Sequence, residues 1–251
     1  MQSSRRAPED RPLATLDTLT LYVVDPEAQR RFYADVMGMS DLGDGRIGYG
    51  EPEMALRFLP ARTPYAPLPT DLFWKIAISV PDIELACAQL ETLGFSDLRP
   101  RQFKDVGYLA HLTDPEGFTI ELIDHWFEGE RPEPVRDDGR LGGGAHLNLL
   151  TLRTAEISIV EPEVLKLGMK PLSVQPVAEH GFTLHFYAAT AEVPPNPDLQ
   201  AIENRSWVYR RPYTVLEFQH LPTLPSPTHR RDEAAGYGGL TFREAHGDLV
   251  P

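Results

Sequence analysis

The sequence predicts an α+β protein made of three repeated β-α-β-β-β modules and a single strand of a partial fourth. Three segments share one pattern: an apolar strand, an amphipathic helix, and a glycine followed by an apolar residue, all at nearly equal spacing. They span residues 16–39, 73–95 and 147–169. Repetition of this order along the chain indicates a repeated supersecondary unit.

Each predicted helix has a recognisable beginning and end. The dipeptides at which the helices begin are Asp25-Pro26, Pro81-Asp82 and Ala155-Glu156. The glycines that end the segments are Gly38, Gly94 and Gly168. Glycine accepts the left-handed conformation of a helix C-cap, so we expect each helix to stop there and a new strand to follow.

The stretches after each helix are typical of strands and complete the modules. They are residues 46–50 and 54–60 in module one, 106–114 and 118–124 in module two, and 169–177, 182–190 and 212–221 in module three. The turn at residues 114–117 has Asp first, Pro second and Gly fourth, which favours a hairpin.

The distribution of Pro, Gly and charge predicts the domain boundaries. Residues 1–13 are expected to form a disordered arm, and residues 14–128 to hold modules one and two. Residues 129–144 are charged and rich in Pro and Gly, as linkers are. Module three is expected at residues 145–223, and residues 224–251 form a tail with the strand of the partial fourth module.

Composition excludes several classes of protein. The net charge is -13, from 24 Lys+Arg against 37 Asp+Glu, and no run of Lys or Arg exceeds two residues, which argues against nucleic-acid binding. No stretch approaches the roughly 18 apolar residues of a membrane span, and the N-terminus lacks the apolar core of an export signal. With a lone cysteine, Cys87, these features favour a cytoplasmic protein.

The pattern resembles the vicinal oxygen chelate superfamily, which includes glyoxalases, bleomycin-resistance proteins and extradiol dioxygenases. Residues 17–39, 114–122 and 148–154 carry the resemblance. Module three is most similar to glyoxalase I, through residues 182–190, 204–220 and 236–242. The resemblance implies that two modules pair so that their curved sheets enclose a barrel-like cleft, and we expect modules one and two to form this pair.

The resemblance also implies a divalent metal (Zn, Ni, Mn or Fe) held by residues of the first and last strands of each module. The corresponding first-strand residues are Thr18, Lys75, Leu149 and Gly239, and the last-strand residues are Arg57, Glu121 and Glu217. Glu121 and Glu217 are the metal-ligand candidates, and Glu217 is also the candidate catalytic base. Because most positions hold no ligand, the ligand set is degenerate.

Further side chains are candidates for substrate binding. Arg57 and Lys75, with Tyr22 and Trp74 at adjacent strand positions, could hold a small anionic or aromatic ligand. Glu121 is a further substrate-binding candidate. Gln219 shares a strand face with Glu217, where it is either a substrate contact or a polar lining residue. The resemblance places Arg153 where glyoxalase I contacts the glutathione carboxylate; a surface arginine at a strand end is the alternative. Trp207 and Tyr209 lie near the end of a long insert, residues 192–209, that is either a lid, an interface or a disordered segment, and Trp207 is the substrate-binding candidate.

Three functions remain open from the sequence. The first is a glyoxalase-I-like lyase or isomerase acting on a small thiol adduct. The second is a metal-free protein of the resistance type that binds a small molecule. The third is an extradiol-dioxygenase-like protein or a structural module that forms a homodimer through an unpaired module.

Overall fold

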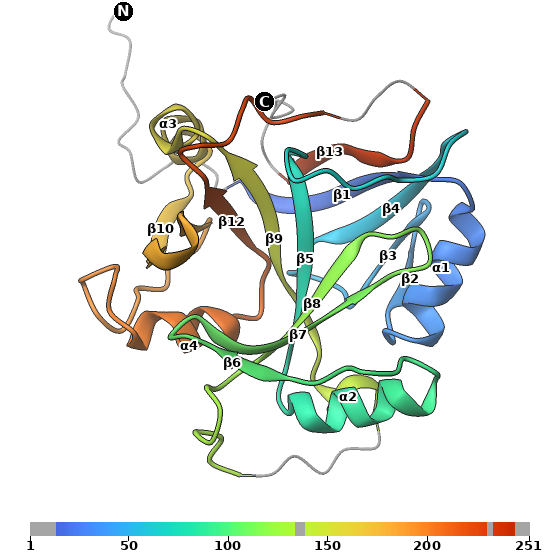
Figure 1. The fold of residues 1–251 in the computed structure, drawn as a ribbon, viewed down its shortest axis with the longest axis horizontal. Coiled ribbons are helices and arrows are strands. Elements are labelled where there is room, and N and C mark those ends of the chain that lie inside the picture. Colours follow the sequence, from blue (N-terminus) through green and yellow to red (C-terminus); the bar gives the residue numbers. More distant parts are fainter. Residues whose placement is uncertain (1–13, 134–138, 230–232, 244–251) are drawn as a thin grey trace, which may run out of the picture.

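The computed structural model describes residues 14–133, 139–229 and 233–243, and the predicted arm at residues 1–13 lies outside them. Module one contains β1 (Thr15–Val23), α1 (Pro26–Asp35), β2 (Ser40–Gly43), β3 (Arg46–Gly48) and β4 (Ala55–Pro60). Module two contains β5 (Phe73–Val80), α2 (Ile83–Thr92), β6 (Arg101–Phe103), β7 (Gly107–Thr113) and β8 (Thr119–Asp124). Module three contains β9 (His146–Thr154), α3 (Ile157–Lys166), β10 (Lys170–Val177), β11 (Phe182–Ala188), α4 (Glu203–Tyr209) and β12 (Val215–His220), and β13 (Gly236–Arg243) follows. The predicted α+β class and the repeated modules are confirmed (Figure 1).

The strands form two sheets, and these differ from the expected arrangement in which modules pair. The larger sheet has the order β10-β11-β12-β9-β5-β8-β7-β6, so module two is continuous with module three. The smaller sheet has the order β13-β1-β4-β3-β2, so module one pairs with the strand of the partial fourth module. In both sheets the junction joins the first strands of two modules in antiparallel register. The curled cleft therefore belongs to modules two and three instead of modules one and two.

Burial explains this pairing. Seven of the eight residues of β5 and seven of the nine of β9 are buried, as expected for strands that are covered on both faces. Such strands need hydrogen-bonded neighbours on both edges, and each supplies one edge to the other. The first strand of module one, β1, instead has β13 at its free edge. The edge of module three that motivated a homodimer is thus covered within the chain, and the homodimer stays a prediction.

The helices begin and end where the sequence predicts. The side chains of Asp25 and Asp82 accept hydrogen bonds from the backbone N–H groups of Ala28 and Leu85, both at 2.9 Å. Glu156 makes no such cap, and α3 also contains Pro162. The glycines after the three helices have positive φ angles of 76°, 96° and 79°. Their conformation turns the chain back toward the sheet, so each module closes as predicted.

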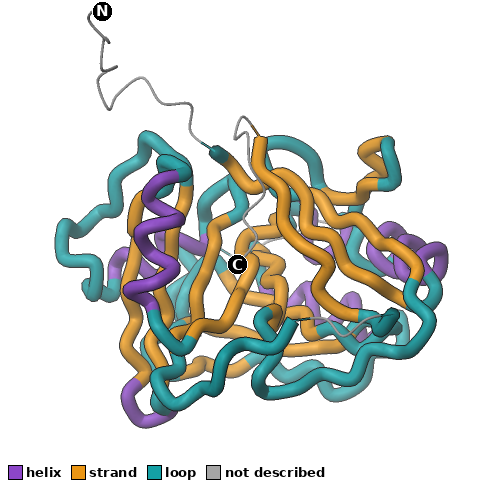
Figure 2. Tube along the Cα trace, turned by 90° about the horizontal axis from the view of Figure 1, so that it is seen from above, coloured by secondary structure: helices purple, strands orange, loops and turns teal. Residues whose placement is uncertain are grey.

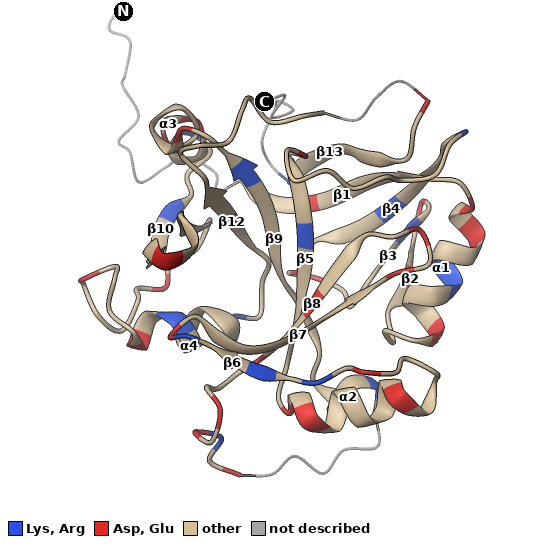
Figure 3. Cartoon of the chain, in the orientation of Figure 1, with Lys and Arg blue, Asp and Glu red and all other residues tan. Residues whose placement is uncertain are grey.

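Figure 2 shows the two sheets from above, with helices at their outer sides. One hydrophobic cluster fills the space between the smaller sheet, the larger sheet and the helices α1, α2 and α3. A second cluster lies among β5, β7 to β12 and α4. Acidic residues lie on the helices and turns more than on the strands (Figure 3). None of the helices in the described part of the chain has the length and apolar character needed to cross a membrane.

Asp114 joins modules one and two. It is buried in the turn between β7 and β8, where it accepts hydrogen bonds from the side chains of Gln29 and Tyr33, both on α1. Burial raises the pKa of Asp114 to about 6, although the backbone N–H of Phe118 and the side chains of Tyr33 and Gln29 partly oppose the rise. The carboxyl therefore couples the packing of α1 to proton uptake.

We predict that Asp114→Asn removes a pH dependence from folding stability. A carboxyl whose pKa is raised in the fold binds its proton more tightly there, so its contribution is greatest below about pH 4 and is lost as the pH rises through about 6. The free energy of unfolding of the wild type, minus that of the variant, should fall by on the order of 3 kcal/mol across this range. Urea unfolding at several pH values measures it.

The matched control is Asp35→Asn, an exposed position on α1, which should leave the pH profile of stability unchanged. Parallel profiles for the wild type and Asp114→Asn would contradict the prediction.

Candidate functional site

The four central strands of the larger sheet bring together charged side chains from two modules. The strands lie in the order β12-β9-β5-β8. Thr151 on β9 is in register with Lys75 on β5 and with Glu217 on β12, and residues in direct register point to the same face of a sheet. On the other side of β5, Glu121 on β8 pairs with Ala77, two residues from Lys75. All four polar side chains therefore share one face.

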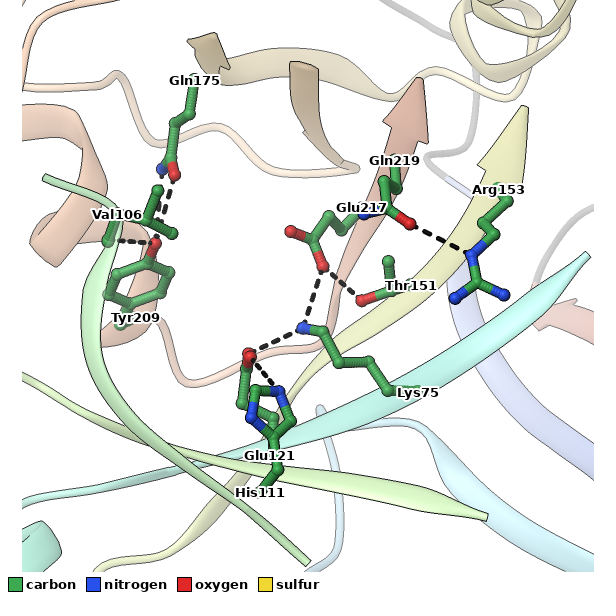
Figure 4. A network of polar contacts seen from close by, with 10 residues as sticks. All are labelled: Lys75, Val106, His111, Glu121, Thr151, Arg153, Gln175, Tyr209, Glu217 and Gln219. Atoms are coloured by element: carbon green, nitrogen blue, oxygen red, sulfur yellow. Dashed lines mark hydrogen bonds and ion pairs between the residues drawn. The ribbon is translucent and has the colours of Figure 1, made fainter. Parts of the chain in front are cut away.

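Lys75 lies between the two carboxylates (Figure 4). Its Nζ donates to Glu121 Oε1 at 2.7 Å and to Glu217 Oε2 at 3.4 Å. Thr151 donates its hydroxyl to the same oxygen of Glu217, and His111 on β7 contacts Glu121 Oε2 through Nε2 at 3.0 Å. Each carboxylate is thus held both by the lysine and by a neighbour.

The cluster is almost fully removed from solvent. Lys75, Glu121 and Glu217 are 2%, 5% and 1% exposed, so their charges must compensate one another. Burial alone would lower the pKa of Lys75, but the carboxylates of Glu121 and Glu217 outweigh it and raise the pKa above its usual value. Lys75 therefore stays an ammonium at neutral pH.

The two carboxyls differ in their affinity for a proton. Burial opposes ionisation of Glu121, but Lys75 and His111 outweigh burial and lower its pKa to about 2. Burial raises the pKa of Glu217, Lys75 opposes the rise, and the charge of Glu121 adds to it. The cluster therefore holds an ionised Glu121, an ammonium and a carboxyl at Glu217 that retains its proton more readily.

A cavity of about 240 Å³ opens beside the cluster. Its walls are mainly apolar and aromatic, from Trp74, Phe103, Val106, Leu109, Ile123, Leu149, Phe182, Leu184 and Tyr209. Lys75, Glu121, Glu217, Gln219, His111 and Arg101 add its polar lining. A larger cavity of about 600 Å³ lies near α3 and β13 and contains none of the three charged residues of the cluster.

The insert between β11 and β12 helps to close this cavity. It ends in α4, whose Tyr209 donates its hydroxyl to the carbonyl of Val106 at 2.8 Å, before β7. Tyr209 is buried and lines the cavity. The guanidinium of Arg211 lies 4.4 Å from the ring centroid of Trp207. Trp207 lines a separate pocket. The insert thus contributes a wall of the cavity through Tyr209, and not through Trp207, the predicted binding residue.

Of the other predicted site residues, Gln219 reaches the cavity, and Arg57, Arg153 and Trp207 do not. Gln219 lines the cavity and accepts a hydrogen bond from Arg153 Nε at 3.1 Å. The guanidinium of Arg153 lies 5.2 Å from the ring centroid of Trp74 and lines the larger cavity. Arg57 is on β4 of the smaller sheet, outside the cleft, because module one does not pair with module two. Lys75, Glu121, Glu217 and Gln219 are therefore brought together, while Arg57, Arg153 and Trp207 are not in this cavity.

Two further residues of the cluster were not selected from the sequence. Thr151 follows Leu149 by two residues on the same strand, so strand alternation places both side chains on the face of the cleft and could have identified Thr151. His111 gives no such signal in the sequence, because its position beside Glu121 follows from the antiparallel pairing of β7 with β8.

The residues present do not fit a divalent metal. Glu121 and Glu217 provide carboxylate oxygens, but an ammonium lies within hydrogen-bonding distance of both. Leu149, at the other first-strand position, has no ligand atom. In the part of the chain that the structure describes, no group of three or more His, Cys, Asp or Glu side chains could hold a metal ion.

The comparisons with known proteins agree with the fold. The model of the Glyoxalase/Bleomycin resistance protein/Dioxygenase superfamily matches residues 15–122, which hold modules one and two. Modules one and two therefore belong to this superfamily. The resemblance inferred from the sequence is thereby confirmed. Membership of a superfamily does not determine the function of the chain.

Similar proteins include glyoxalases and a dioxygenase. The structure matches glyoxalase I from Zea mays with a TM-score of 0.57 and 16% identity, over 91% of this chain and 74% of that chain. It matches a putative dioxygenase from Bacillus subtilis with a TM-score of 0.57 and 15% identity, over 92% and 70% of the two chains. A lactoylglutathione lyase of Pseudomonas aeruginosa is 37% identical over 60 residues, 23% of this chain and 32% of that protein. The last match spans about a third of its relative, and the structural matches show the fold alone.

We predict that Lys75→Met lowers the free energy of unfolding by about 3–5 kcal/mol, because it leaves two buried carboxyls without their cation. Urea unfolding at neutral pH measures the loss. Adding Glu121→Gln should restore part of the stability, since one of the two charges is then removed.

Lys166→Met is the control at an exposed lysine on α3, with an expected change within about 0.5 kcal/mol. Equal effects of Lys75→Met and Lys166→Met would show that the buried cluster does not stabilise the fold.

Proposed function

We propose that this chain is a metal-independent protein that binds a small molecule in the cleft of modules two and three. The observation that carries the proposal is the cavity beside Lys75, which joins apolar and aromatic walls to a buried polar cluster. Small-molecule sites typically have this composition: mostly apolar lining with a few fixed polar groups.

The walls define the class of ligand. Trp74, Phe103, Phe182 and Tyr209 present aromatic surface to the cavity, which favours a flat or aromatic molecule. A volume of about 240 Å³ restricts the bound part to a small molecule or to a fragment of a larger one. Apolar contact with these walls would supply most of the binding free energy.

The polar lining would orient the ligand. An ammonium has three N–H donors, and Lys75 uses two of them toward Glu121 and Glu217. The remaining donor capacity, together with His111 and the amide of Gln219, suits a carbonyl, phenol or carboxylate oxygen. We therefore infer an aromatic ligand with one oxygen acceptor.

We predict that Leu109→Trp abolishes ligand binding by filling the cavity. Leu109 is buried and lines the cavity, so the larger side chain occupies the ligand's volume. A thermal-shift screen of the wild type with small aromatic acids, phenols and ketones identifies a probe, and titration calorimetry with that probe measures the loss.

The control for the position of binding is Ile159→Trp on α3, which is 70% exposed and lines the larger cavity. It should leave the affinity for the probe unchanged. Loss of binding in Ile159→Trp with retention in Leu109→Trp would assign the ligand to the other cavity and refute the proposal, as would a screen without any hit.

A second candidate function is a glyoxalase-I-like lyase or isomerase reaction on a small thiol adduct. One observation favours it: Glu217 is buried at the cavity, and burial raises its pKa, so it can hold and release a proton beside a bound molecule. The superfamily reaction uses a metal to stabilise negative charge. Since these residues do not fit a metal, the ammonium of Lys75 would have to supply that stabilisation.

We predict that any conversion of the methylglyoxal–glutathione adduct by the wild type is lost in Glu217→Gln, because the amide cannot exchange the proton. Absorbance of the thioester product measures turnover. Glu156→Gln, a substitution at the N-terminus of α3, is the control that should keep the wild-type rate. A wild-type rate equal to that of Glu217→Gln would reject this candidate.

A further inference from the structure

We propose that the ammonium group of Lys75 takes the cation position of this cleft and keeps divalent ions out of it. The superfamily resemblance implies a metal ligated by the first and last strands of paired modules. In this chain both last-strand carboxylates remain, at Glu121 and Glu217, whereas the first-strand positions hold Lys75 and Leu149. The inference concerns the cation alone and does not depend on which ligand the cavity binds.

The ammonium and a metal would compete for the same oxygens. Nζ of Lys75 lies 2.7 Å from Glu121 Oε1 and 3.4 Å from Glu217 Oε2, and both oxygens face it (Figure 4). A divalent ion bound to the same two oxygens at about 2.0–2.2 Å would overlap the space of the ammonium. It would also meet a like charge in a buried environment, where repulsion is strong.

Neighbouring groups hold the carboxylates in place. The second oxygen of Glu121 contacts His111 Nε2 at 3.0 Å, and Glu217 accepts a hydrogen bond from the hydroxyl of Thr151. The two carboxylates are therefore positioned by the sheet and by these partners, so that a change of the lysine alone should leave them facing one another. This preorganisation is what makes a single residue decide which cation is bound.

The surrounding cavity leaves room for a new ligand atom. Leu149 lines the same cavity from β9, at the first-strand position of module three. Lys75→His would place an imidazole between Glu121 and Glu217 and create a set of three protein ligands, and Leu149→Gln would add a fourth. Carboxylate, imidazole and amide ligands suit Zn²⁺ and Ni²⁺.

The test uses the purified full chain, equilibrium dialysis against Zn²⁺ or Ni²⁺, and metal analysis of the dialysed protein. We expect no stoichiometric metal in the wild type. We expect stoichiometric Zn²⁺ in Lys75→His, tighter binding in Lys75→His/Leu149→Gln, and loss of the ion when Glu217→Gln is added to either. Because the readout is bound metal, it is independent of any activity.

A second variant, Lys75→Gln, provides the test if Lys75→His does not fold. Lys75→Gln keeps a long polar side chain that can donate to the carboxylates and can also ligate a metal. For this variant we expect Zn²⁺ to raise the midpoint of thermal unfolding, with no such rise in the wild type or in the surface control Lys166→Gln.

Two outcomes would overturn the proposal. The first is stoichiometric metal in the wild type that is lost on Glu217→Gln. The second is a folded Lys75→His or Lys75→Gln that takes up no more metal than the wild type. Failure of the ligand screen with these metal results intact would reject the binding function while leaving the role of Lys75 standing.

Discussion

The antiparallel pairing of β5 with β9 is the constraint on which the rest of the structure depends. It joins two modules through their first strands, so the parallel neighbours β8 and β12 lie on opposite sides of the junction. Glu121 and Glu217 belong to different modules, and only this junction brings both to one ammonium. The same junction forms the apolar walls beside them, so the fold, the charge cluster and the cavity have one origin.

Charge compensation inside this junction gives the cleft its chemical character. A buried lysine between two carboxyls contributes little net stability over an apolar core, but removal of one partner is costly. The cluster therefore fixes the arrangement of the two modules and also leaves polar groups at the base of an apolar cavity. A cation that belongs to the protein is always present, whereas a bound ion depends on supply.

Local features could be predicted from the sequence, and long-range pairing could not. Asp82 and Gly94 delimit α2 because capping and left-handed conformations are properties of short segments. The choice of partner for module two depended on which strand edges remain free after folding. The sequence therefore predicts that modules adjacent in the chain pair with each other. This prediction places Arg57 in a cleft that its sheet does not form. Glu121, Glu217 and Lys75 were identified as cleft residues because the superfamily pattern fixes their strand positions. The sequence does not show the role of Thr151 beside Glu217, because that role arises from a cross-strand register. It favours Trp207 over Tyr209 because only the folded insert shows which of the two side chains faces the cavity.

The most direct test of the role of Lys75 is a crystal structure of the wild-type protein grown with zinc, with anomalous scattering recorded at the zinc edge. We expect continuous density for the lysine side chain ending between Glu121 and Glu217, with no anomalous peak there. An anomalous peak shared by the two carboxylates, with Lys75 turned away, would contradict it.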